Sequence, residues 1–133
     1  MTVNTIEEAH TWLARFEQFC REPHWRRGDA GALFITHCIG FGLFCDGVKG
    51  LEEFEKREWA HFRDEHKAFT FDVGAAKVIP EGAMVCIAVP WISQSPIIGA
   101  PDRRGRATFI LLYFSDTKTP KCVHLHMSLN TEK

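Results

Sequence analysis

The chain has 133 residues and a formal net charge of −1, from 16 Lys and Arg against 17 Asp and Glu. With 45% hydrophobic residues, including 11 Phe and 4 Trp, it can bury a core, which excludes an intrinsically disordered protein. A charge so close to zero gives no overall attraction to nucleic acid or to a membrane, and we expect neither as a partner. The length is typical of one domain, so we expect residues 1–133 to fold as a single unit.

Cysteine usage and the chain start indicate a cytoplasmic location. The five cysteines are an odd number and include no CxxC pair: Cys20, Cys38, Cys45, Cys86 and Cys122. The first residues, "MTVNTIEEAHTW", lack the apolar core of a signal peptide, and no apolar run is long enough to span a membrane. We therefore expect reduced, mostly buried thiols. No P-loop, GxGxxG or GxSxG motif is present, and we expect no cofactor.

The first half of the chain reads as helix, strand and helix. Residues 5–21 place their apolar side chains on one helical arc, which predicts an amphipathic helix. The segment "ALFITHCIGFG", 32–42, is rich in β-branched and aromatic residues and predicts a strand. The segment 43–50 contains turn-forming residues and predicts a loop, and residues 51–66 again show the helical period.

After residue 66 the pattern changes to strands joined by turns. Four strands are predicted, at 68–79, 83–95, 106–114 and 121–129. Pro90 interrupts the second of them and predicts a bulge or a sheet edge there. The basic cluster "RRGR", 103–106, is expected at a turn tip. Helices followed by a run of antiparallel strands indicate an α+β protein.

The order of elements and several short motifs resemble the SnoaL-like families of the nuclear transport factor 2-like superfamily. The motifs are "VHLHMS" at 123–128, the stretch "GDAGALFITHCIGFGLFCDGVKGLEEF", and "EGAMVCIAV" followed by "GAPDRRGRATFILLYF". They are also similar to the association domain of calcium/calmodulin-dependent protein kinase II. The resemblance implies a cone-shaped, cystatin-like α+β roll, in which a curved, mostly antiparallel sheet wraps around N-terminal helices. It also implies a pocket and a homodimer.

Two residues are candidate acid or base groups. Asp46 follows the first strand, in a region comparable to that of the general-base aspartate of the similar ketosteroid isomerases. His126 could act as a general base near neutral pH. The alternatives are that Asp46 is a turn residue and that His124, His126 and Ser128, which share one strand face, support the sheet or an interface. Two histidines need further ligands to hold a metal, and we expect no metal site.

The large aromatic side chains predict an apolar pocket. The expected pocket residues are Trp25, Phe41, Trp59, Phe62, Trp91, His124 and Ser128. Core packing is the alternative for each aromatic residue. Glu55 and Glu58 fall within the apolar arc of the second helix, either at its edge or at the mouth of a cavity.

The sequence leaves two functions open. The first is a small-molecule-binding protein for an apolar ligand, an isomerase-like or cyclase-like enzyme if Asp46 or His126 works as acid or base. The second is a non-catalytic dimerisation or association module. The fold hosts both kinds of protein, so whether this chain is an enzyme stays open.

Overall fold

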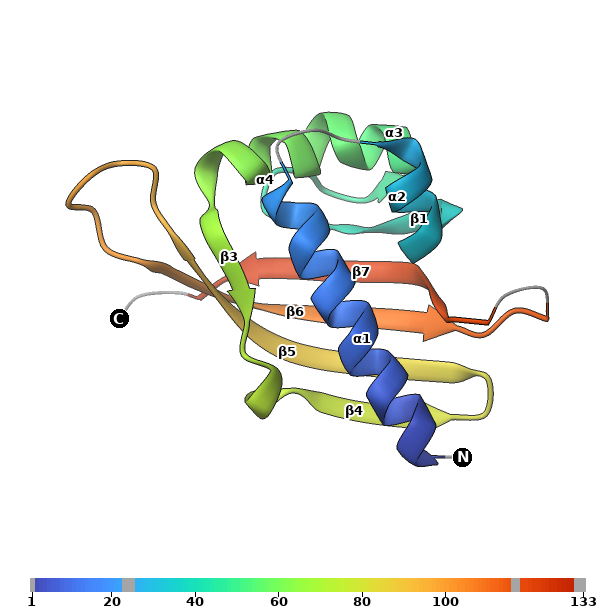
Figure 1. Ribbon diagram of the computed structural model, residues 1–133. Helices are drawn as coiled ribbons and strands as arrows, with labels where there is room; N and C mark the ends of the chain where they lie inside the picture. The colour runs from blue at the N-terminus through green and yellow to red at the C-terminus, as the bar shows by residue number, and fades with distance from the viewer. Residues whose placement is uncertain (1, 23–25, 116–117, 131–133) are drawn as a thin grey trace.

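The computed structural model describes residues 2–22, 26–115 and 118–130 (Figure 1). The helical elements are α1 (Thr2–Arg21), α2 (Arg27–Leu33), α3 (Leu51–Phe54), the π-helical turn η1 (Glu55–Trp59), α4 (Ala60–Glu65) and the 3-10 turn η2 (Val73–Ala75). The strands are β1 (Phe34–Phe41), β2 (Val48–Lys49), β3 (Lys67–Phe71), β4 (Lys77–Glu81), β5 (Met84–Gln94), β6 (Arg103–Leu112) and β7 (Lys121–Leu129). Among these described helices, none is both long and apolar enough to cross a membrane.

The strands form one seven-stranded sheet in the order β2-β1-β7-β6-β5-β3, with β4 also paired to β5. All pairs are antiparallel except β1 with β7, which run parallel. A parallel pair needs a long connection, and here most of the chain lies between its two strands. The predicted α+β fold, with N-terminal helices and a curved, mostly antiparallel sheet, is confirmed.

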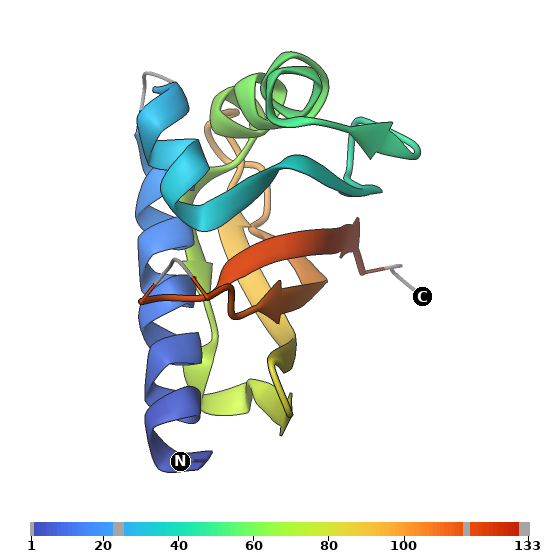
Figure 2. The ribbon, with the colours of Figure 1, turned by 90° about the vertical axis from the view of Figure 1, so that its right-hand side faces the viewer.

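The helix α1 covers one side of the sheet (Figure 2). Its apolar arc is buried: Trp12, Leu13 and Phe16 are at most 3% exposed. The Trp12 ring lies 4.9 Å from the ring of Phe109 on β6, and its indole N–H donates to the carbonyl of Leu33 over 3.0 Å. The helical period seen in the sequence is therefore the face that packs on the sheet.

The second helical stretch runs from α3 through η1 to α4, as predicted for residues 51–66, but it is not uniform. The π-helical turn η1 widens its middle. Both Glu58 and the next residue, Trp59, are buried there. Two neighbouring side chains of a helix thus point into the interior, although a regular helix turns successive side chains by about 100°.

Two predicted strands differ from the structure. The predicted strand 32–42 begins at Phe34, because the preceding residues belong to α2. The predicted strand 68–79 is divided into β3 and β4 by η2. These two short strands pair with opposite halves of β5, Phe71 opposite Trp91 and Lys77 opposite Ala88. At the turn between them, the strand that pairs with β5 changes from β3 to β4.

Pro90 lies at this same point without a bulge. The β5–β6 register is continuous through Pro90, which pairs with Arg106. The carbonyl of Pro90 accepts the Asp72 N–H over 2.9 Å. The proline nitrogen therefore faces the junction of β3 and β4, a local edge where no ladder hydrogen bond is lost. The cluster "RRGR" lies at the start of β6, not at a turn tip.

Candidate functional site

The histidine strand β7 presents its polar side chains to the open side of the sheet. Leu125 and Met127 are buried under the helices, so the alternate residues His124, His126 and Ser128 point the other way. The ring of His126 lies 5.8 Å from the ring of Phe41 on β1. The prediction that the three polar residues share one face agrees with this arrangement, and that face is the one without α1.

The second candidate acid or base, Asp46, is exposed in the turn between β1 and β2. Among the described residues, no hydrogen bond, ion pair or ring contact joins Asp46 to His126. Their catalytic roles stay predictions. In the described part of the chain, no three His, Cys, Asp or Glu side chains group so that they could hold a metal ion.

The predicted pocket aromatics divide into two groups. Trp59, Phe62 and Trp91 are each only 2% exposed and belong to the packed core. Trp59 stacks on Phe54 with ring centroids 5.4 Å apart, and Phe62 meets Trp91 edge to face at 5.8 Å. Phe41, by contrast, is 42% exposed on the open side of the sheet. Trp25 lies outside the described residues.

A buried carboxylate holds the loop that follows β1. Glu58 is fully buried, and its two oxygens accept the backbone N–H groups of Leu43, over 3.0 Å, and Phe44, over 2.8 Å. Gly42 lies so close that an added Cβ would meet the carboxylate at 2.2 Å. Burial raises the pKa of Glu58, and the two N–H donors oppose that rise. Glu58 therefore links η1 to this loop, with each carboxylate oxygen bonded to a backbone N–H group.

The other glutamate of this helix, Glu55, forms an ion pair with Arg63. The guanidinium Nη1 donates to both carboxylate oxygens, at 2.7 and 2.8 Å, and the Arg63 side chain is only 8% exposed. Arg63 also lies over the ring of Phe19, 4.7 Å from its centroid, which ties the second helical stretch to α1. Burial raises the pKa of Glu55, and Arg63 lowers it.

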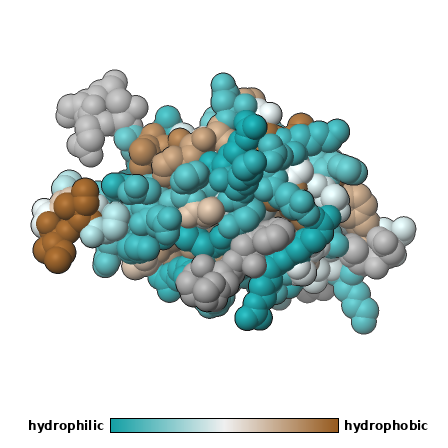
Figure 3. Space-filling model, turned by 90° about the horizontal axis from the view of Figure 1, so that it is seen from above, coloured by the Kyte–Doolittle hydropathy of each residue, from teal (hydrophilic) through white to brown (hydrophobic). Residues whose placement is uncertain are grey.

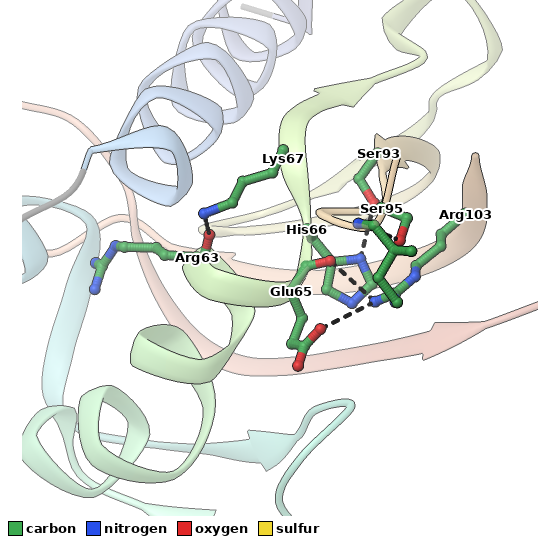
Figure 4. Close-up of polar contacts among 8 residues, drawn as sticks. Arg63, Glu65, His66, Lys67, Ser93, Ser95 and Arg103 are labelled. Atoms are coloured by element: carbon green, nitrogen blue, oxygen red, sulfur yellow. Dashed lines mark hydrogen bonds and ion pairs between the residues drawn. The ribbon is translucent and has the colours of Figure 1, made fainter. Parts of the chain in front are cut away.

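One buried, ionisable side chain was not among the predicted residues. His66 follows α4 and is 3% exposed, with its ring stacked on Phe62 at 4.5 Å. Its Nδ1 lies 2.8 Å from the hydroxyl of Ser93 on β5 (Figure 4). Burial, helped by the positive charge of Arg103, lowers the pKa of His66 to about 4. The sequence offered only a histidine between a helix and a strand, with no sign that both partners would be buried.

A cleft of about 400 Å³ lies beside His66, between the end of α1 and the start of β3. Charged side chains of both signs line it: Arg21, Glu22, Arg63, Asp64 and Lys67, together with Cys20, His66 and Ala68. Ala68 has a φ of 51°, the only positive φ of a non-glycine residue in the described ranges, so the backbone is strained at the cleft.

The chemistry available at this cleft is limited. The pKa of His66 keeps its imidazole neutral at pH 7, so its second nitrogen can donate or accept one hydrogen bond. Ser93 is buried, and a ligand cannot reach its hydroxyl as a nucleophile. Burial also raises the pKa of the Cys20 thiol, which excludes a reactive thiolate near neutral pH. The cleft is suited to binding a small polar molecule.

Solved structures share this fold. No protein family model and no curated protein sequence matches the chain. A nuclear transport factor 2-like superfamily protein from Salmonella enterica aligns at 13% identity over 99% of this chain and 95% of its own, with a TM-score of 0.79. The yeast UBP3-associated protein BRE5 aligns at 17% identity over 99% of both chains, with a TM-score of 0.73. A proposed ketosteroid isomerase from Shewanella frigidimarina aligns at 12% identity over 91% and 94%, also at 0.73. The chain therefore has the nuclear transport factor 2-like fold.

Proposed function

We propose that this chain, which has the nuclear transport factor 2-like fold, is an association module that forms a homodimer through the open face of its sheet. The observation that carries the proposal is the contrast between a filled interior and an apolar outer surface. The space between helices and sheet is occupied by Trp59, Phe62 and Trp91, the residues expected to line a ligand pocket.

The open face carries apolar side chains in rows that cross the sheet. In one row Ile79, Cys86, Ile110, His124 and Ile39 are successive partners on β4, β5, β6, β7 and β1. Ile79 and Ile39 are exposed, and the members between them are half-buried. A solvent-facing sheet normally alternates to polar residues, so a row of this kind indicates a surface that becomes covered.

The size of this face suits a second copy of the chain. Strands about 4.8 Å apart and residues about 3.3 Å apart give the 43 residues of β4, β5, β6, β7 and β1 a projected area of roughly 700 Å². Stable interfaces bury about that area on each partner. A two-fold dimer uses one patch twice, so an apolar patch without a strong charge of one sign can pair with itself. In this arrangement His124, His126 and Ser128 lie in the interface. Support of an interface is one of the roles that the sequence left open for them.

The test is the mass of the protein in solution. We expect the wild type to sediment at twice its 15.2 kDa chain mass. Ile110→Arg, at the centre of the row, should sediment as a monomer and keep its circular dichroism spectrum. Val73→Arg is the matched control, because Val73 is exposed on η2, outside the face. A wild type that stays monomeric at all concentrations, or an Ile110→Arg dimer, would refute the proposal.

A second candidate function is small-molecule binding, favoured by the cleft beside His66. The cleft is polar, whereas the predicted ligand is apolar and the predicted acid or base groups, Asp46 and His126, lie elsewhere. Benzoate is a suitable probe, because Lys67 and Arg21 at the cleft carry positive charge. Binding would shift the amide resonances of Lys67 and Ala68 in a nuclear magnetic resonance titration, and unchanged resonances at saturating benzoate would count against this candidate.

A further inference from the structure

The hairpin that joins β5 to β6 reaches away from the rest of the protein (Figure 1). Its tip is hydrophobic and stands apart from the body in the space-filling view (Figure 3). Ile97 is 66% exposed and Ile98 is fully exposed, the highest exposures among the large apolar side chains of the described residues. The six residues 96–101 are Pro-Ile-Ile-Gly-Ala-Pro, without one polar side chain.

The backbone of this tip leaves few hydrogen-bond donors exposed. Pro96 and Pro101 have no N–H group. The N–H of Ile97 donates to the Ser95 hydroxyl over 3.1 Å, and the N–H of Ala100 donates to the Ile97 carbonyl over 3.2 Å. Only the N–H groups of residues 98 and 99 lack a partner within the described chain. The two prolines and these two hydrogen bonds therefore lower the cost of desolvating the N–H groups of the tip.

Positive charge follows the apolar tip. Residues 95–106 contain three arginines and one aspartate, a formal net charge of +2 on a chain whose total is −1. Arg103 donates to the Glu65 carbonyl over 2.9 Å and lies 3.9 Å from its carboxylate (Figure 4). Arg104 and Arg106 are exposed and pair with no carboxylate in the described ranges. Arg104 lies six residues behind Ile98, which is at most roughly 20–22 Å along the chain.

We propose that the tip formed by Ile97 and Ile98 docks onto the surface of a phospholipid bilayer with anionic headgroups. A protruding apolar tip that buries itself by about 5–10 Å would bring Arg104 to within about one Debye length of the lipid phosphates. A bilayer accepts an apolar tip of any shape, whereas residues 96–101 have no side chain that could make a directional polar contact in a protein pocket. The expectation of no membrane partner came from the net charge of the whole chain. That total does not show that positive charge is concentrated beside the tip.

The experiment is co-sedimentation of the full chain with vesicles of phosphatidylcholine containing about 30% phosphatidylglycerol, and with pure phosphatidylcholine vesicles. The tip variant is the double substitution Ile97→Ser, Ile98→Ser. The matched control is Val73→Ser, because Val73 is 37% exposed and lies on η2, away from the hairpin and outside the open face of the sheet. A third variant, Arg104→Gln, tests the charge.

We expect the wild type and Val73→Ser to sediment with the anionic vesicles, and the tip variant to lose roughly tenfold in apparent affinity. The arginine variant should weaken the preference for anionic vesicles, and raising the salt from about 0.05 to 0.5 M should weaken binding of the wild type in the same way. Three results would overturn the proposal: no wild-type binding at low salt, an equal loss of affinity in Val73→Ser, or a changed solution mass of the tip variant. The last would assign the tip to a contact between copies of the chain.

Discussion

The two faces of β5 differ although they belong to the same eleven residues. On the side of α1, Val89, Trp91 and Ser93 are almost fully buried, and Trp91 touches the rings of Phe62 and Phe69. On the other side, the intervening residues of β5 are half-buried or exposed although most are apolar. One face of β5 therefore packs in the core, whereas the other is a largely apolar surface that stays partly or fully exposed. Substitutions on the two faces should therefore act on different properties, stability on one side and association on the other.

The largest expected effect separates the two faces on adjacent residues. Trp91→Ala should lower the free energy of unfolding by about 3–5 kcal/mol, because it leaves a cavity among packed rings. Ile92→Ala, on the open face, should cost less than about 1 kcal/mol in the monomer. Urea unfolding of both variants, at concentrations where any dimer has dissociated, measures the difference. Equal losses would mean that the open face is also packed within one chain.

The buried His66 should make the inner face sensitive to acid. Its pKa is about 4 in the folded protein, below the value of about 6.5 in an unfolded chain. The unfolded state therefore takes up the proton first, so this contribution is complete above about pH 6.5 and is lost as the pH falls towards 4, by up to about 3 kcal/mol. Glu58, whose pKa is raised by burial, acts in the opposite sense and lowers stability as the pH rises through its folded value.

The acid sensitivity is measured as the free energy of unfolding at pH 7 and at pH 4.5. His66→Gln should be less stable than the wild type at pH 7 and should change less between the two pH values. His126→Gln is the matched control, because His126 is exposed on the open face. A wild type and a His66→Gln variant with the same pH dependence would contradict the assignment to His66.

A smaller effect is expected at a glycine that makes room for the core. An added Cβ at Gly105 would meet the Trp91 ring at 2.1 Å and the Ser128 carbonyl oxygen at 2.3 Å. Gly105→Ala should therefore cost about 1–3 kcal/mol through overpacking. Gly28→Ala is the control, since an added Cβ on this α2 residue meets nothing within 4 Å, and it should gain about 0.5–1 kcal/mol. Thermal unfolding of both variants decides whether Gly105 is needed for space.

The smallest effect on stability is expected at the hairpin tip. Ile98→Ser should change the free energy of unfolding by less than about 0.5 kcal/mol, because the Ile98 side chain packs against nothing in the chain. The measurement is urea unfolding in the absence of lipid. A loss comparable to that of Gly105→Ala would show that the tip folds back onto the protein, and would remove the basis for its proposed contact with a bilayer.

The main elements could be predicted because their signals are local. The helical arc of Trp12, Leu13 and Phe16 and the alternation in "VHLHMS" depend only on residues a few positions apart. The point where a strand gives way to η2 could not be predicted in this way. It depends on which half of β5 each strand pairs with. The alternation of side chains and the length of a strand do not determine the pairing partner of Phe71 or Lys77.

The candidate site was less predictable than the fold. Glu58 was recognised as a carboxylate in an apolar arc, but its burial depends on η1 and on two backbone N–H groups fifteen and fourteen residues earlier. His66 gave no signal, because the Ser93 hydroxyl that bonds it comes from a strand 27 residues later. The aromatic residues could be identified from the sequence as large apolar side chains. Their number does not show whether they line a pocket or pack in the core.

By itself the sequence determined the α+β class, the amphipathic helices, the long antiparallel strands and the fact that His124, His126 and Ser128 share one face. These follow from periods of 3.6 and 2 residues, which the backbone imposes on its neighbours. Only the tertiary structure decided which face of the sheet α1 covers, and hence that Trp91 is core while His126 and Phe41 lie outside. That choice depends on contacts between distant segments, such as Trp12 with Phe109, and no local period records them.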